Sequence, residues 1–131
     1  MDTGPIVAIL EKPDADHEVC VEQLQRAPGP LLTCWPVITE AAWLVRAEPP
    51  VLAALLTSVS GNPFNILPLT EADLSGIAAI LTKYEALGIQ LADAALLRLA
   101  IRERIDTIFT LDRRDFSVLR MPHRKRLHLI P

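Results

Sequence analysis

Short apolar segments alternate with helical segments along this 131-residue chain, and this alternation most constrains what it can fold into. The apolar segments that have the length and composition of short buried strands are 31–34, 65–69, 107–111 and 127–130. Because helices separate these strands, the strands can run parallel, with the helices crossing over on both faces. We therefore predict an α/β fold in three layers (α/β/α) with a mostly parallel central sheet.

Proline and glycine mark where the predicted helices end. After an opening helix with Pro5 in its first turn and Asp2 or Thr3 as its cap, helices are predicted at 14–27, 37–47, 51–59, 71–87 and 92–104. The breaks between elements are Pro28-Gly29-Pro30, Pro36, Pro49-Pro50, Gly61-Asn62-Pro63 and Gly88. The segment TEAD at 70–73 is a capping-box-like helix start, which explains Glu71 and Asp73 by helix electrostatics.

Length and composition indicate one domain, 1–131, because half of the residues are hydrophobic and can form a substantial core. We expect no membrane span, since no apolar run approaches the required length. The N-terminus lacks the basic and then apolar pattern of a secretory signal. Cys20 and Cys34 are two unpatterned cysteines, typical of reduced thiols in a cytoplasmic protein.

Charge is distributed unevenly along the chain. Residues 1–97 contain 12 acids and 4 bases, a net charge of −8, whereas residues 98–131 contain 4 acids and 9 bases, a net charge of +5. A basic C-terminal third is consistent with contacts to a nucleic-acid backbone. Solvated surface arginines would produce the same count, so charge alone leaves both interpretations open.

Four acidic residues have unusual neighbours. Asp2 adjoins the first apolar helix, Glu40 lies inside VITEAAWLV, Asp93 lies inside LADAALL, and Asp112 follows the strand at 107–111. Each has an ordinary explanation: Asp2 and Asp93 suit helix caps, Glu40 could pair with Arg46, and Asp112 could begin a turn. Asp112 also stands at the carboxyl end of a strand, where open parallel sheets bind their ligands.

A divalent cation would explain all four acids together. Burying an unpaired carboxylate costs on the order of several kcal/mol, and carboxylates brought together repel. Mg²⁺ or Mn²⁺ removes this conflict, because both ions prefer hard oxygen ligands. The chain has no glycine-rich phosphate loop, and its serines lack the context of an activated nucleophile. The pattern favours metal-assisted hydrolysis of a phosphodiester.

Four segments of the chain carry a resemblance to a known family. They are DTGPIVAIL at 2–10, VITEAAWLV at 37–45, KYEALGIQLADAALLRLA at 83–100 and TLDRRDF at 110–116. In this order they resemble the motifs of the PIN-domain family, most closely its prokaryotic VapC-type toxins of toxin–antitoxin pairs. No single motif is specific, but the four together span nearly the whole chain.

The resemblance implies a Mg²⁺- or Mn²⁺-dependent ribonuclease that leaves a 5′-phosphate and a 3′-hydroxyl. It assigns the metal site to Asp2, Glu40, Asp93 and Asp112. It also suggests that Asp115 assists a ligand or the attacking water. Thr3 and Thr110 become candidate donors to the acids, although capping and strand-end bonds explain these threonines equally well.

The same resemblance implies partners. We expect a single-stranded or looped RNA substrate, whose backbone would contact Arg113, Arg114, Arg124, Lys125 and Arg126. Family toxins usually dimerise and are silenced by a small antitoxin, so a homodimer and an antitoxin are also expected. Trp35 and Trp43 could stack on bases, but their apolar neighbours favour packing in the core.

Two departures from the family pattern affect the site. Family members normally have a strand before the first aspartate, whereas only Met1 precedes Asp2 here. Either the start lies upstream, or the sheet begins unusually and holds Asp2 less firmly. Close relatives often have a further acid where this chain has Gln90. The glutamine would leave fewer carboxylates on one side of the metal site.

Two other functions fit the same residues. One is a catalytically weak module of the same fold that binds RNA or protein. The other is a nuclease acting on single-stranded DNA, which the small size of the chain disfavours. A metal titration separates the first from the ribonuclease, and a comparison of DNA with RNA separates the second.

Overall fold

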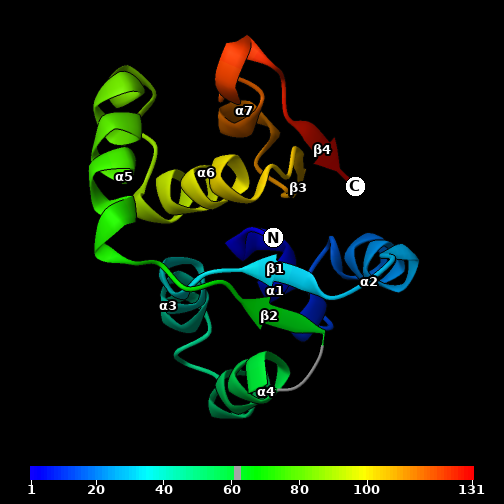
Figure 1. Cartoon of the computed structure of the whole chain (residues 1–131). Helices are drawn as coiled ribbons and strands as arrows, with labels where there is room; N and C mark the ends of the chain where they lie inside the picture. The colour runs from blue at the N-terminus through cyan, green and yellow to red at the C-terminus, as the bar shows by residue number, and fades with distance from the viewer. Residues whose placement is uncertain (61–62) are drawn as a thin grey trace.

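A computed structural model describes residues 1–60 and 63–131 and shows helices and short strands in the expected order (Figure 1). In chain order the elements are α1 (Thr3–Leu10), α2 (His17–Arg26), β1 (Leu31–Thr33), α3 (Trp35–Leu44), α4 (Pro49–Ser60), β2 (Phe64–Ile66), α5 (Glu71–Lys83), η1 (Glu85–Leu87), α6 (Leu91–Glu103), β3 (Thr107–Phe109), α7 (Arg113–Phe116), η2 (Pro122–Arg124) and β4 (His128–Ile130). The two η elements are short 3₁₀ helices. The predicted helix stop at Gly61-Asn62 lies outside the described residues.

The strands of the described ranges form two parallel pairs. β1 pairs with β2, with Leu31 opposite Phe64, and β3 pairs with β4, with Thr107 opposite His128. The predicted parallel direction is confirmed, but each strand is only three residues long. The second strand ends earlier than predicted because its partner β1 ends at Thr33, whose carbonyl accepts the last bond of the ladder from the Leu67 N–H at 2.9 Å, and the chain then enters α3.

Met1 and Asp2 connect the two pairs. The Met1 amino group donates to the carbonyl of Leu32 in β1, and the Asp2 N–H donates to the carbonyl of Phe109 in β3 at 2.9 Å. The Thr33 hydroxyl donates to the Met1 carbonyl at 3.0 Å. These two residues therefore stand where a central strand between β1 and β3 would run, and Figure 1 shows the N-terminus at this place.

Beside Met1, an apolar cavity of about 490 Å³ separates β1 from β3. Leu31 lines it from β1, Ile108 from β3 and Leu96 from α6. We call this cavity the inter-strand slot. Beside this slot, in the part of the chain that the structure describes, the backbone bonds of Met1 and Asp2 join the two strand pairs.

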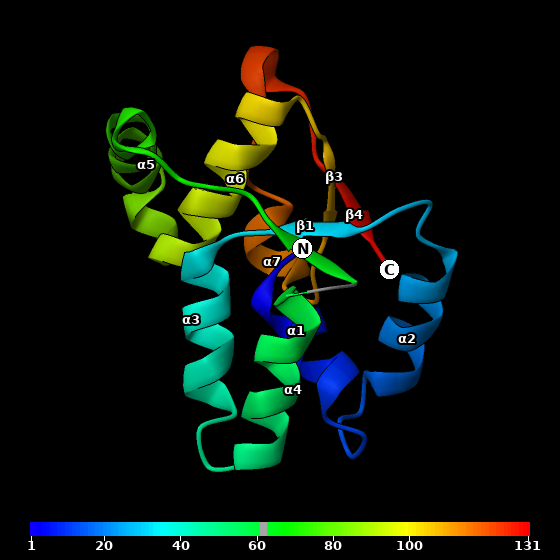
Figure 2. The same cartoon turned by 60° about the horizontal axis from the view of Figure 1, so that its bottom comes forward.

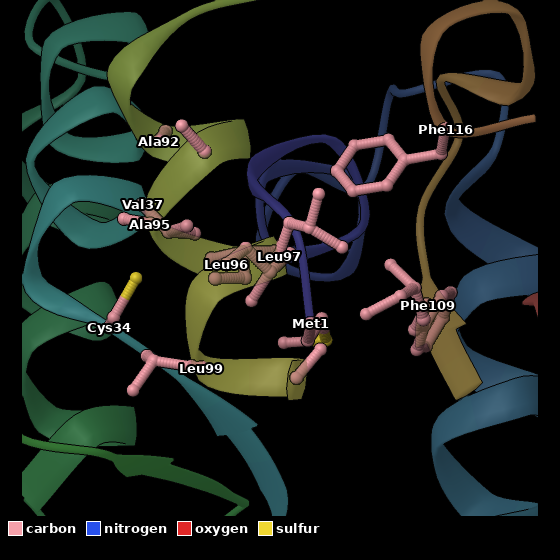
Figure 3. Close-up of a cluster of buried hydrophobic side chains, with 14 of the residues drawn as sticks. Met1, Cys34, Val37, Ala92, Ala95, Leu96, Leu97, Leu99, Phe109 and Phe116 are labelled. Carbon is pink, nitrogen blue, oxygen red and sulfur yellow. The ribbon is translucent and has the colours of Figure 1, made fainter. Parts of the chain in front are cut away.

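The helices pack in two groups. α1 contacts α2, α3 and α4, whereas α6 contacts α5 and α3. In both views α5 and α6 lie on one side of the β1–β2 pair and α4 lies on the other (Figures 1 and 2). Buried side chains of Met1, Leu97, Phe109 and Phe116 gather between α6 and β3 (Figure 3). No helix in the described ranges is long and apolar enough to cross a membrane.

Several other predicted boundaries were wrong, among them the end of the helix predicted at 37–47, which lies at Leu44. Pro36 was expected to end a strand, but it lies in the first turn of α3, where its missing N–H costs no helical bond. The helix predicted at 71–87 ends at Lys83 and continues as η1 to Leu87. Gly88 then adopts the left-handed conformation, at φ 73°, which glycine tolerates without a steric cost.

Asp73 joins α5 to α6. It completes the predicted capping box by accepting from the Thr70 N–H at 3.1 Å, and it is 1% exposed. Its carboxylate also accepts from Arg98 at 3.0 Å and from Arg102 at 2.6 Å, contacts that the sequence interpretation missed. The Thr70 bond and the two guanidinium groups hold the pKa of Asp73 below its usual range.

Candidate active site

Asp2 is held by three hydrogen bonds and is only 6% exposed. Besides the N–H bond to β3, its carboxylate accepts from the Thr3 N–H at 2.7 Å and from the Thr110 hydroxyl at 2.6 Å. Burial raises the pKa of Asp2, although these bonds oppose the shift. Asp2 therefore caps α1, as the ordinary explanation predicted, and it is firmly held rather than loosely tethered.

Glu40 lies on α3, and Thr3 connects it to Asp2 by donating a hydrogen bond to each carboxylate. The Thr3 hydroxyl donates to Oε2 of Glu40 at 2.5 Å, while the Thr3 N–H binds Asp2. The alternative pairing of Glu40 with Arg46 is wrong, because Arg46 instead binds the carbonyl of Trp43 and stacks on its ring. Thr3 thus connects the beginning of α1 to the middle of α3.

Asp93 reaches the same place from the first turn of α6. Its Oδ2 accepts from the Gln90 N–H at 2.8 Å, and Gln90 completes a capping box at this helix start. Burial, together with the charges of Asp2, Glu40 and Asp112, raises the pKa of Asp93 to about 6. Gln90 therefore caps a helix at the pocket wall.

Asp112 and Asp115 enter from the loop after β3 and from α7. Oδ1 of Asp112 accepts from the Asp115 N–H at 3.0 Å, so Asp112 caps α7. The Asp112 N–H donates to the Thr110 hydroxyl at 3.0 Å. Arg114 donates twice to Asp115, at 2.7 and 3.3 Å, and is itself 82% exposed at its side chain. Thr110 consequently links Asp112 to Asp2.

One pocket of about 260 Å³ collects these side chains. Five acids line it: Asp2, Glu40, Asp93, Asp112 and Asp115. Thr3, Gln90 and Arg114 also line it, and Thr110 lies behind it on Asp2. The pocket draws on α1, α3, α6 and α7 and on the residues that cap them, so acids up to 113 positions apart in sequence converge.

The donor chemistry of the pocket fits a hard divalent cation. Among the bonds of the described residues, one oxygen each of Glu40, Asp93 and Asp112 has no hydrogen-bond donor. Carboxylate oxygens of this kind are preferred ligands of Mg²⁺ and Mn²⁺. Within residues 1–60 and 63–131, however, no three His, Cys, Asp or Glu side chains form a preassembled metal-binding group.

The basic residues do not all lie at the pocket. Arg114 lines it, whereas the neighbouring Arg113 binds the carbonyl of Pro131. Lys125 pairs with Asp106, which precedes β3 and thus lies at the opposite end of that strand from the acids. The structure therefore brings one of the predicted backbone-binding residues to the acids and keeps Lys125 away from them.

Arg124 and Arg126 flank Lys125 and are also absent from the pocket lining. Arg124 lies in η2 with a positive φ of 60°, and Arg126 forms an isolated antiparallel bridge with Arg120. Both are exposed. Their predicted role on an RNA backbone would apply to a surface beyond the acidic pocket.

The interpretation of the two tryptophans as core residues was wrong. Trp35 is 58% exposed and Trp43 is 64% exposed, both on α3. Trp43 follows Glu40 by three residues, and the Arg46 guanidinium lies 3.9 Å from its ring centroid. The sequence signal was the position of Arg46, because an arginine three residues after an exposed aromatic residue can stack on it along a helix.

The chain belongs to the PIN-domain family, whose model matches residues 1–120. This confirms the resemblance and the predicted fold class. Ribonuclease VapC26 of Mycobacterium tuberculosis is 34% identical to this chain over 133 residues, covering 100% of this chain and 98% of VapC26.

A solved structure also resembles this fold. It is the crystal structure of VapC20 of Mycobacterium tuberculosis, described as a toxin that cleaves the sarcin–ricin loop. The TM-score is 0.75 over 81% of this chain and 83% of VapC20, with 15% sequence identity. At that identity the match supports the fold and not a shared substrate.

Proposed function

We propose that this protein is a metal-dependent endoribonuclease that hydrolyses RNA to 5′-phosphate and 3′-hydroxyl ends. The observation that carries the proposal is the convergence of five acids on one pocket in a PIN-domain chain. Similarity over the full length to a protein named Ribonuclease VapC26 supports RNA as the substrate. Because the pocket contains no His or Cys, a covalent intermediate on either residue type is disfavoured.

Asp2, Glu40, Asp93 and Asp112 would hold Mg²⁺ or Mn²⁺. A cation held there would supply an activated water and would offset charge on the phosphodiester oxygens. Thr110 orients the carboxylate of Asp2 through its 2.6 Å bond, and Thr3 orients Glu40. Bonds of this kind fix the direction of acids that would bind metal.

Arg114 and Asp115 would act on the substrate side of the pocket. Asp115 accepts two hydrogen bonds from the guanidinium of Arg114. These bonds position the arginine at the rim of the pocket, while most of its side-chain surface stays accessible. A phosphate reaching the pocket would meet this positive group, which binds phosphate oxygens in a planar fork. We assign Arg114 to backbone binding and Asp115 to orienting Arg114 or the attacking water.

We further propose that the protein acts as a toxin restrained by a small antitoxin, that it dimerises, and that it works in the cytoplasm. The names of its relatives, a VapC ribonuclease and a VapC toxin, support the first of these statements. Cys20 and Cys34 are both free and buried, which suits a reducing compartment. Co-purification of a small basic or acidic protein encoded beside this chain would test the antitoxin assignment.

The first experiment is a cleavage assay on mixed single-stranded RNA with Mg²⁺, with Mn²⁺ and with EDTA. We expect cleavage that requires the ion and is lost in Asp93→Asn. Asp106→Asn is the matched control, because it makes the same chemical change at the opposite end of β3. If folded wild-type protein cleaves no RNA with either ion, or if Asp93→Asn retains full activity, the proposal fails.

A second candidate is a binding module of the same fold with weak or no catalysis. It is favoured by one observation: in the described part of the chain, the acids are not preassembled as a metal-binding group. Calorimetric titration with Mn²⁺ separates the two, because the nuclease requires metal binding that Asp93→Asn weakens. Single-stranded DNA, tested beside RNA under the same conditions, separates the ribonuclease from a DNA-directed enzyme.

A further inference from the structure

Trp43 is a large exposed side chain on α3, next in sequence to Leu44 of the pocket lining, and the proposed hydrolysis does not use it. It is 64% exposed, the highest exposure among the large hydrophobic side chains of the described residues. Its neighbour Leu44 is 54% exposed and lines the acidic pocket. Exposing an indole costs hydrophobic stabilisation, so an aromatic side chain kept in this position is a candidate contact.

The helix places Trp43 near the acids. Glu40 and Leu44, one turn apart on α3, both line the pocket. Trp43 lies between them in sequence, and helical geometry puts it about 60° around α3 from Glu40. Trp35 is equally exposed but lies about 140° around the same helix from Glu40.

Arg46 adds a positive charge to the Trp43 ring. Its guanidinium carbon lies 3.9 Å from the ring centroid, and its Nη1 donates to the Trp43 carbonyl at 2.6 Å. In the described ranges no carboxylate pairs with Arg46, so its charge is available to a ligand. An indole with an adjacent guanidinium suits a planar base joined to a phosphate.

Resting on the proposed ribonuclease function, we propose that Trp43 and Arg46 form a stacking platform for an unpaired RNA base next to the bond in the acidic pocket. The base would stack on the indole, and the following phosphate would meet Arg46. Aromatic stacking of this kind tolerates any base, because every base has a π-face. The platform would therefore select unpaired over duplex RNA without selecting a sequence.

Tryptophan fluorescence tests the platform directly, because Trp35 and Trp43 are the two tryptophans of the chain. Trp35→Phe leaves only Trp43 as the reporter, and Trp43→Phe leaves only Trp35. Both are combined with Asp93→Asn and titrated with short mixed-sequence single-stranded RNA in Mg²⁺. We expect RNA to quench the Trp43 reporter and to leave the Trp35 reporter nearly unchanged.

Cleavage kinetics provide the second readout, in proteins that keep Asp93. Trp43→Leu keeps an apolar side chain but removes the π-face, so we expect KM to rise roughly 5- to 150-fold with kcat nearly unchanged. Trp43→Phe should retain most of the affinity, and Trp35→Leu is the matched control on the same helix. Base-paired RNA should bind wild type and Trp43→Leu with similar affinity.

The proposal is overturned if RNA leaves the Trp43 reporter unquenched, or if Trp43→Leu and Trp35→Leu change KM equally. It is also overturned if Trp43→Leu converts a dimer to a monomer, measured by light scattering, while RNA affinity is unchanged, since α3 would then be a protein contact. Failure of the proposed function is distinct: wild-type protein would show no metal-dependent cleavage of RNA.

Discussion

The hydroxyl of Thr110 donates to Oδ2 of Asp2 at 2.6 Å and accepts the N–H of Asp112 at 3.0 Å. One buried hydroxyl thus connects two acids of the pocket, Asp2 and Asp112, that are 110 positions apart in sequence. This hydroxyl fixes the end of β3 relative to the start of α1. The orientation of Asp2 depends on a residue that itself has no charge.

Thr110→Val should impair both stability and cleavage. Valine has a similar shape, but it leaves Oδ2 of Asp2 and the Asp112 N–H without their partner, at a cost of about 1–3 kcal/mol. Because Asp2 would lose its orientation, we expect cleavage to fall about 10- to 100-fold. Urea denaturation and the RNA cleavage assay measure the two effects.

Two controls separate this effect from a general loss of packing. Thr110→Ser restores the hydroxyl and should recover most of the activity. Thr107→Val makes the same change at an exposed position in β3, three residues before Thr110, and should have little effect. Wild-type activity in Thr110→Val would contradict the role assigned to this hydroxyl.

The contribution of Asp93 to the stability of the metal-free protein should increase as the pH falls from about 7 to about 4. The Met1 amine, whose pKa burial lowers to about 6, and Asp73, whose pKa is lowered, act in the opposite direction, so the Asp93 contribution is read as the difference between wild type and Asp93→Asn. The folded-state pKa of Asp93 is about 6, above the usual value of 3.8, so the folded protein takes up a proton before the unfolded chain does. The gain should be on the order of 1–2 kcal/mol, less than the full shift implies because Asp93 is only partly buried. Denaturation in EDTA across this pH range measures it.

Asp93→Asn should remove most of this pH dependence, because asparagine does not titrate. The raised pKa of Asp2 acts in the same direction and would leave a smaller residual slope. An identical pH dependence of stability in wild type and Asp93→Asn between pH 7 and pH 4.5 would contradict the raised pKa of Asp93.

Gly76→Ala should fail to give the stabilisation expected of alanine in a helix. A Cβ at this position would lie 2.9 Å from Cδ and 3.0 Å from Nε of Arg98, so the arginine must move away from Asp73. In the Arg98→Ala background that conflict is absent, and Gly76→Ala should then stabilise by about 0.5–1 kcal/mol. A double-mutant cycle by urea denaturation measures the difference.

Arg114→Ala should weaken RNA binding and reduce its dependence on salt. Losing one phosphate contact on single-stranded RNA should lower the slope of log affinity against log salt by about 0.7. Lys125→Ala is the matched control, because Lys125 pairs with Asp106 away from the acids. Equal slopes for the two variants would indicate that the basic C-terminal surface binds RNA as a whole.

Extending the chain ahead of Met1 with two or three apolar residues should stabilise the protein by roughly 1–3 kcal/mol. The inter-strand slot offers apolar walls and the facing edges of β1 and β3. Burial already lowers the pKa of the Met1 amine to about 6, and a peptide N–H would make the same bond to Leu32 without a charge. A proline-containing extension of equal length should give no gain in thermal denaturation.

The order of elements and the acidic residues were accessible from the sequence because both depend on local pattern. Apolar runs, prolines and capping residues determine where helices begin, and Asp2, Glu40, Asp93 and Asp112 stood out by their neighbours. The sequence offers helix capping and a shared metal site as alternative explanations of these acids. Asp2 and Asp112 cap helices and also line the acidic pocket. Asp2, Asp93 and Asp112 come together because each lies at the start of a helix.

Other features depend on contacts between distant segments, which a single sequence does not reveal. The bonds of Asp73 to Arg98 and Arg102 span at least 25 positions. The exposure of Trp43 depends on which side of α3 packs against α1 and α6. The position of Lys125 follows from the register of β4 on β3, since a basic run in sequence has no fixed distance to the acids.

The capping bonds of the pocket acids have a consequence for how the activity can be lost. The positive ends of the α1 and α6 dipoles face the pocket and offset part of the repulsion between carboxylates. An alanine at Asp2 would therefore remove a charge and loosen a helix at once, whereas asparagine keeps the cap. Substitutions that remove one of these capping acids would therefore reduce the amount of folded protein together with its activity.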